Sequence, residues 1–353
     1  KGQAMQISYD EGNVVLTEVR DFDLAQTLEC GQCFHFKKLA EQEYAVCAFH
    51  RLLRIRQEKD SVILFDTAMQ DYEMIWRDYF DFGRDYGRIK AALLQTDDTL
   101  KEAVETMQGV HILQQEFFET LISFIISQNK QIPHIKKIVE TLSERFGDDL
   151  GEINGMRFFA FPTVSQMCNV TEEDLRDCKT GFRAPYIVDA VQKTADGQIS
   201  EAALKAADTA ECEKMLTKIK GVGSKVANCC MLFGLDKRDA FPVDVWIGRA
   251  LKTLFFDGQM PGRQETERLL HELGPMSGLW SSFIFRERKR TKKKLRHLQR
   301  HVLEATAAMP SSICFFTEKQ CVSARKIKKL KKYNLIIKNK RYFQLSVDKQ
   351  KAE

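Results

Sequence analysis

The pattern of apolar and polar positions changes character near residue 66 of the 353-residue chain. Before that point, short runs rich in β-branched and aromatic residues alternate with polar turns, a pattern typical of antiparallel strands. We therefore predict strands at residues 14–16, 44–49, 52–56 and 62–65. The segment 30–36 is placed inside the same sheet, with its glycine as a bend in a strand.

From residue 71 onward, apolar residues recur every three or four positions, which predicts amphipathic helices. Helices are predicted at 72–80, 100–107, 116–129 and 133–146, with further helix starts at 162–167 and 171–175. The order predicts an α+β protein in which an N-terminal antiparallel sheet packs on an all-helical domain. We place the domains at 5–110, 111–285 and 286–353.

Two glycines, Gly221 and Gly223, flank Val222 between predicted helices at 209–220 and 224–235. Glycine tolerates positive φ, so this spacing predicts a tight turn that joins two helices. The second helix would then begin with free N–H groups and the positive end of its dipole, a natural seat for a DNA phosphate. Taken alone, however, Gly-Val-Gly is usually only a turn.

Lys225 and Asp244 are the candidate chemical pair. A lysine amine attacks a sugar carbon and forms a Schiff base when burial or cationic neighbours lower its pKa. A carboxylate stabilises positive charge that develops on the sugar and transfers protons. Pro242 breaks the chain just before Asp244, which predicts that the aspartate begins a new helix directed back at Lys225. Judged singly, a lysine one step inside a helix is usually solvated.

The sequence Lys-Val-Ala-Asn-Cys at 225–229, followed by Pro-Val-Asp-Val at 242–245, resembles the motifs of helix-hairpin-helix (HhH-GPD) DNA glycosylases. It is most similar to the 8-oxoguanine DNA glycosylase branch, as a bacterial-type member, over about residues 5–285. The resemblance implies a bifunctional enzyme that flips 8-oxoguanine out of duplex DNA and excises it. Lys225 would form the Schiff base with help from Asp244, and β-elimination would then cleave the strand.

The same resemblance assigns residues to the flipped base. Gly31 would offer its main-chain carbonyl to the N7–H donor that distinguishes 8-oxoguanine from guanine. Cys229 and Phe285 would face the two sides of the base, and Ser281 stands where the family has a glutamine for the Watson–Crick edge. Trp246 replaces a phosphate-contacting histidine, and the hairpin residues would bind phosphate; these are Gly221, Gly223 and Ser224.

Residues for the opposite strand follow in the same way. Asn129 would fill the space left by the extruded base, and His134 stands where eukaryotic relatives have a cytosine-reading arginine. Phe182 and Arg183 match a Tyr-Arg pair, as an aromatic wedge and a donor to cytosine. The preceding Gly181 is equally well explained as the end of a helix.

Composition agrees with an intracellular protein, in the cytoplasm or nucleoid of a bacterium or in a eukaryotic nucleus. The ten cysteines are scattered among apolar neighbours, which indicates reduced thiols, and Cys30 and Cys33 are expected to be buried despite their redox-like spacing. We expect no cofactor, no iron–sulfur cluster and no metal, because no suitable set of cysteines and histidines is present. No membrane partner is expected, and one extruded base requires only a monomer.

Charge separates the C-terminal segment from the rest of the chain. Residues 286–353 hold 21 basic and 5 acidic side chains, whereas residues 1–285 hold 33 basic and 44 acidic ones. Such a basic segment favours nucleic acid, although a disordered extension is an equal alternative.

Two alternative functions remain open at this stage. One is a glycosylase for other oxidised or alkylated bases, since Ser281 departs from the family's glutamine. The other is a DNA-binding module without catalysis. Binding of the DNA backbone requires neither Lys225 nor Asp244, so the presence of both residues argues against this alternative. The sequence therefore favours the enzyme.

Overall fold

The computed structural model describes residues 5–96 and 109–243, together with isolated positions between 247 and 269. Several sequence predictions lie outside the described residues: Asp244, Trp246, Ser281, Phe285, the helix at 100–107 and the segment 286–353.

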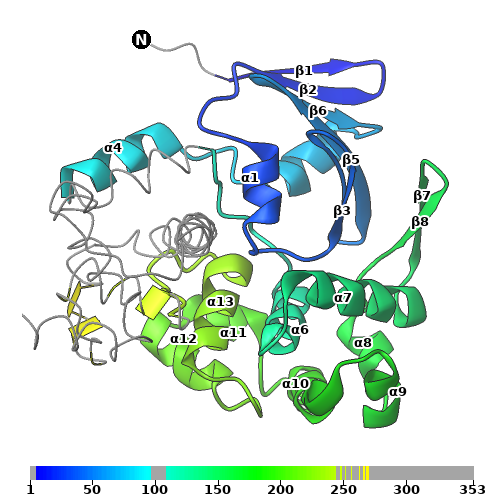
Figure 1. The fold of residues 1–353 in the computed structure, drawn as a ribbon, viewed down its shortest axis with the longest axis vertical. Coiled ribbons are helices and arrows are strands. Elements are labelled where there is room, and N and C mark those ends of the chain that lie inside the picture. Colours follow the sequence, from blue (N-terminus) through cyan, green and yellow to red (C-terminus); the bar gives the residue numbers. More distant parts are fainter. Residues whose placement is uncertain are drawn as a thin grey trace, which may run out of the picture.

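An antiparallel sheet with the strand order β1-β2-β6-β5-β4-β3 forms the N-terminal part (Figure 1). Within the described residues, the strands are β1 (Gln6–Asp10), β2 (Asn13–Thr17), β3 (Phe36–Ala40), β4 (Glu43–Ala48), β5 (Arg51–Glu58), β6 (Ser61–Phe65), β7 (Asp149–Ile153) and β8 (Met156–Phe159). The predictions of β2, β4, β5 and β6 are confirmed. The sequence did not reveal β1 or β3, because β1 is exposed along its whole length and β3 carries polar residues on an edge.

One face of this sheet is buried under helices, as period-two alternation in β2, β5 and β6 requires. Val14, Leu53 and Leu64 are fully buried on that face, and they pack with Leu28 and Trp76. Trp76 ends a π-helical turn, η1 (Tyr72–Trp76), between α2 (Met69–Asp71) and α3 (Arg77–Tyr79), so the predicted helix at 72–80 is confirmed with a local irregularity.

The predicted strand at 30–36 is wrong for most of its length. Asp23 caps α1 (Leu24–Glu29) through the main-chain N–H of Gln26, and the chain after the helix turns at Gly31, where φ is +99°. A helix cap and a left-handed glycine favour this helix-turn geometry over an extended strand. Cys30 and Cys33 lie in the turn as buried thiols, as expected.

The other helices within the described residues form the second part of the fold; in Figure 1 most of them lie below the sheet, and α4 lies to its left. They are α4 (Tyr86–Thr96), α6 (Phe117–Ser127), α7 (Ile132–Phe146), α8 (Val164–Met167), α9 (Glu172–Asp177), η3 (Gly181–Arg183), α10 (Ala184–Ala195), α11 (Glu201–Ala206), α12 (Thr209–Leu216) and α13 (Ser224–Gly234). The helices predicted at 116–129 and 133–146 are confirmed, and Thr163 and Thr171 form capping boxes at the predicted helix starts. The hairpin β7–β8 was not predicted.

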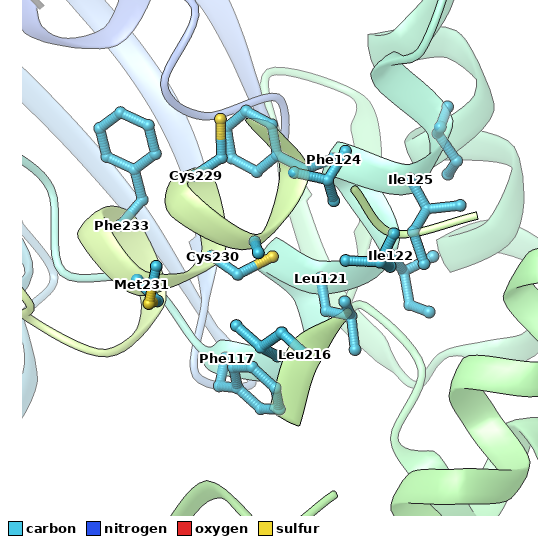
Figure 2. Close-up of a cluster of buried hydrophobic side chains, with 14 of the residues drawn as sticks. Phe117, Leu121, Ile122, Phe124, Ile125, Leu216, Cys229, Cys230, Met231 and Phe233 are labelled. Atoms are coloured by element: carbon cyan, nitrogen blue, oxygen red, sulfur yellow. The ribbon is translucent and has the colours of Figure 1, made fainter. Parts of the chain in front are cut away.

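The core of the helical part lies between α6 and α13. Figure 2 shows Phe117, Leu121 and Phe124 of α6 facing Cys229 and Cys230 of α13. Burying each of these apolar side chains stabilises the fold by about 1.5–3 kcal/mol, so moving the two helices apart would be costly. This contact therefore fixes the distance between α6 and α13. The orientation of α13 relative to α6 is therefore set by the core.

Candidate active site

The predicted hairpin turn joins α12 to α13, and its two glycines differ in backbone conformation and in the space around them. Gly221 has a φ of +77°, and a Cβ added there would lie 2.3 Å from Cδ2 of Tyr186. Gly223, the N-cap of α13, has a φ of −100° and nothing within 4 Å of an added Cβ. Gly221 is thus required by the fold, whereas the space at Gly223 is open for a ligand, next to the exposed Ser224.

Helix α10 holds the hairpin turn through one carboxylate. Asp189 Oδ2 accepts a hydrogen bond from the main-chain N–H of Lys220 at 2.7 Å and an ion pair from Lys193 Nζ at 2.8 Å. Lys193 also donates to the main-chain oxygen of Lys218 at 2.7 Å. Sequence reasoning missed Asp189, because nothing in its local pattern connects it to a turn 31 residues later.

Lys225 lies in the first turn of α13 and is half-buried. Its Nζ donates to Ser127 Oγ at 3.4 Å and stands 5.0 Å from the ring centroid of Phe124. Ser127 Oγ donates its own proton to the main-chain oxygen of Phe124 at 2.7 Å, so the hydroxyl oxygen acts as an acceptor towards Lys225. The lysine is therefore held at a defined position between α6 and α13.

The turn that contains Gly31 is joined to the helix that contains Lys225 and Cys229. Gln115 donates from its main-chain N–H to the oxygen of Phe233 in α13 at 2.7 Å, and its Nε2 donates to the main-chain oxygen of Gln32 at 2.8 Å. Cys229 is buried one turn after Lys225. The elements that carry these candidate base-pocket residues are thus fixed to each other by Gln115.

The contacts of Gln32 explain why a glutamine follows Gly31 in this turn. Its buried side chain donates to the main-chain oxygens of Thr27 and His111, both at 2.8 Å, and accepts from the N–H of Leu113 at 3.0 Å. The side chain therefore fastens the turn to the segment that leads into α6, and it was not singled out from the sequence.

Asn228 is a further residue that sequence reasoning missed. Its Oδ1 accepts from the main-chain N–H of Phe241 at 2.9 Å, and its Nδ2 donates to the oxygen of Ser224 at 2.9 Å and to Glu213 Oε2 at 3.3 Å. The signal in the sequence is a polar amide within an apolar helix, since a buried amide requires partners. Asn228 thereby fixes the chain just before Pro242.

The candidate residues for the opposite strand lie at the end of α6 and near η3. Asn129 is exposed with a φ of +52°, His134 is exposed in the first turn of α7, and the side chain of Phe182 is 54% exposed. Arg183 is only 2% exposed; it donates to the main-chain oxygens of Thr180, at 3.2 Å, and of Gln128. Phe182 is thus presented to solvent, whereas Arg183 turns into the protein.

The surface around the hairpin carries cationic side chains. Lys179, Lys218 and Lys220 are exposed on the loops that precede η3 and α13. Among the residues that the structure describes, no group of three or more His, Cys, Asp or Glu side chains is placed to hold a metal ion. In the same part of the chain, no helix has the length and apolar character needed to cross a membrane.

Comparisons with known families agree with this architecture. The N-terminal domain of 8-oxoguanine DNA glycosylase matches residues 14–121, and the HhH-GPD superfamily of base excision DNA repair proteins matches residues 122–276. The chain belongs to the 8-oxoguanine DNA glycosylase family of the HhH-GPD superfamily. The chain therefore has the sheet-plus-helices fold that the sequence predicted.

Individual relatives support the assignment over different lengths. The 8-oxoguanine glycosylase/lyase of Clostridium acetobutylicum, solved with double-stranded DNA containing cytosine opposite 8-oxoguanine, is 34% identical, with a TM-score of 0.78 over 81% of this chain and 98% of that one. The N-glycosylase/DNA lyase OGG1 of Arabidopsis thaliana is 31% identical over 64% of this chain and 65% of its own length. The N-glycosylase/DNA lyase of Saccharomyces cerevisiae is 36% identical over 41% of this chain and 42% of its own length. The chain thus spans less than two thirds of these two curated relatives.

Proposed function

We propose that this glycosylase excises 8-oxoguanine from duplex DNA with Lys225 as the nucleophile and Asp244 as its partner, and then cleaves the strand as a lyase. The observation that carries the proposal is the placement of Lys225 Nζ, held by Ser127 and Phe124 directly after the hairpin that would seat a phosphate. A lysine placed only for solubility would not be half-buried against an aromatic ring and a hydroxyl.

The reaction needs one nucleophile and one carboxylate. The neutral amine of Lys225 forms a bond to C1′ as the glycosidic bond breaks, and the electron pair leaves with the base, which takes up a proton. The sugar ring opens as the C1′–O4′ bond breaks, giving a protonated imine. Loss of a proton from C2′ then expels the 3′ phosphate, and hydrolysis of the imine frees the enzyme. Asp244 stabilises positive charge on the sugar during the first step.

Recognition of the base and of its partner strand follows the assignments made from the sequence. The carbonyl of Gly31 accepts from N7–H of 8-oxoguanine, Cys229 and Phe285 cover its faces, and Ser281 lies at the edge where the family has glutamine. On the other strand, Phe182 wedges into the stack. Arg183 contacts cytosine only after its guanidinium leaves the carbonyls that now hold it.

The remaining contacts are to the DNA backbone. The N–H groups at Gly223 and Ser224 donate hydrogen bonds to phosphate oxygens, and the exposed lysines around the hairpin neutralise phosphate charge. Trp246 stands where the family has a phosphate-contacting histidine, and its indole N–H is a donor to the same phosphate. The protein acts inside the cell as a monomer, because one extruded base occupies one site.

The test is borohydride trapping on duplexes that carry a single 8-oxoguanine opposite C, A, G or T. Lys225→Gln removes the nucleophile, and Lys214→Gln is the matched control, because Lys214 is an exposed lysine of α12 to which the proposal assigns no DNA contact. We expect a covalent adduct for the wild type and for Lys214→Gln, and none for Lys225→Gln.

The other outcomes distinguish the alternatives. Base release without an adduct would mean that water is the nucleophile, and would remove Lys225 from that role. Binding without release from any of the four duplexes would leave only a DNA-binding module. Release of alkylated bases in preference to 8-oxoguanine would show that the substrate is an alkylated base.

A further inference from the structure

Three consecutive residues at the end of α6, Ser127, Gln128 and Asn129, lie together at the proposed site. Ser127 accepts from the Nζ of Lys225, and Asn129 is the exposed residue proposed to fill the space left by the base. Gln128 stands between them and has no role in the proposed reaction. Its contacts indicate one.

The side chain of Gln128 joins α6 to the hairpin. Its Nε2 donates to the main-chain oxygen of Gly221 at 3.2 Å and to that of Ile125 at 3.2 Å. An amide nitrogen has two hydrogens, so both are used, each on a separate carbonyl. One carbonyl belongs to the last turn of α6, and the other belongs to the turn that precedes α13.

The main chain of Gln128 holds the wedge segment. Its oxygen accepts from Nη2 of Arg183, the residue that follows Phe182. The wedge and the hairpin are also linked through Tyr186 of α10, because its ring lies against Gly221 and packs edge-on to Phe182 with centroids 6.1 Å apart. Gln128 is therefore the point at which the end of α6, the wedge and the hairpin are tied together.

We propose that Gln128 is a positioning residue that couples the opposite-strand wedge to the hairpin carrying the nucleophile. The inference rests on the proposed function and deepens it. Gln128 fixes the carbonyl of Gly221, four residues before Lys225, relative to the segment that enters the DNA stack. When this bond is lost, DNA still binds, but Nζ of Lys225 is no longer held at reacting distance from C1′ while the wedge is inserted.

Two substitutions distinguish the role of the Nε2 hydrogen bonds of Gln128 from the role of its side-chain shape. Gln128→Glu keeps the shape but replaces the donor by an acceptor that faces two carbonyl oxygens. Gln128→Met keeps a similar length without either group, and it provides a second variant if the charged one does not fold. Gln131→Glu is the matched control: it makes the same change at an exposed glutamine three residues along, with no cap bond to lose.

Two quantities are measured for each protein. The single-turnover rate of base release is measured at saturating enzyme on 8-oxoguanine opposite C and opposite A. The Kd is measured for a duplex that contains a tetrahydrofuran abasic analogue, which cannot be cleaved. The first reports positioning in the reacting complex, and the second reports binding alone.

We expect Gln128→Glu to lower the single-turnover rate by about 10- to 100-fold, the loss typical of a misplaced reacting group. Its Kd should stay within about threefold of that of Gln131→Glu, which carries the same added charge. Gln128→Met should show a smaller loss of rate in the same direction. Equal effects of Gln128→Glu and Gln131→Glu on the rate, or a weaker Kd at an unchanged rate, would overturn the proposal. Failure of the wild type to release the base would instead show that the proposed function is wrong, whatever Gln128 does.

Discussion

Replacing Gly221 by alanine tests whether the hairpin is fixed by its contact with α10. The perturbation is a single methyl group placed on a residue with a φ of +77° and directed at the ring of Tyr186. Three ring atoms would lie 2.3, 2.5 and 2.7 Å from the new Cβ, far inside van der Waals contact. The ring cannot accept the methyl without moving.

The expected cost has two parts. A left-handed backbone costs a non-glycine residue about 1–2 kcal/mol. Forcing a methyl group into an occupied space costs about a further 1–3 kcal/mol. The sum of about 2–5 kcal/mol predicts a fall in Tm of at least about 4 °C, at the roughly 2 °C per kcal/mol typical of larger domains.

Gly223→Ala is the matched control in the same turn. Its φ of −100° suits alanine, and an added Cβ meets no atom. The expected loss in the free energy of unfolding therefore comes only from alanine being a poorer N-cap, and is about 1 kcal/mol or less. On the proposed function, however, that Cβ enters the space of a phosphate. We therefore expect Gly223→Ala to weaken DNA binding by about tenfold, or about 1.4 kcal/mol, with little change in Tm.

The assay is thermal unfolding of both variants, with and without Tyr186→Ala in a double-mutant cycle. Removing the ring should recover the overlap part of the cost at Gly221, a coupling of about 1–3 kcal/mol. A Gly221→Ala protein as stable as Gly223→Ala, or a zero coupling with Tyr186, would refute the reasoning.

Three further predictions concern single side chains near the site. Ser127→Ala removes the acceptor of Lys225 Nζ and should slow borohydride adduct formation about fivefold, the effect of roughly 1 kcal/mol, with the Tm kept. Asn228→Leu strands the buried N–H of Phe241 and should lower the free energy of unfolding by about 1–3 kcal/mol in urea titrations. Burial and the nearby Glu119 raise the pKa of Glu116 from 4.5 to about 7, so the wild type should lose stability as the pH rises through this window. Glu116→Gln should abolish that loss in pH-dependent thermal melts, and an unchanged slope would contradict the assignment.

Local sequence patterns predicted most of the elements, because their causes are local. Runs of β-branched residues indicated β2, β4, β5 and β6, and threonine caps indicated where α8 and α9 begin. The edge strands β1 and β3 escaped detection, since an exposed or polar edge carries no alternating apolar signal. The segment around Gly31 was placed in a strand because its apolar residues matched one, although the cap at Asp23 favours a helix and turn.

The chemistry of the site was likewise indicated by sequence only where it is carried by a compact motif. Lys225 and Cys229 stand one helical turn apart in a single run, so their common helix could be predicted. The residues that hold them in place could not, because Ser127 and Gln115 are about a hundred positions from the atoms they contact.

By itself, then, the sequence determined that a sheet precedes helices, that a glycine turn precedes a lysine, and which family the chain resembles. The tertiary structure alone decided that Gly221 is needed by the fold while the space at Gly223 is open, and that Arg183 turns inwards onto Gln128. The physical reason is the range of the forces involved. Backbone preferences act over a few residues, whereas steric overlap and buried hydrogen bonds depend on which distant segments packing brings together.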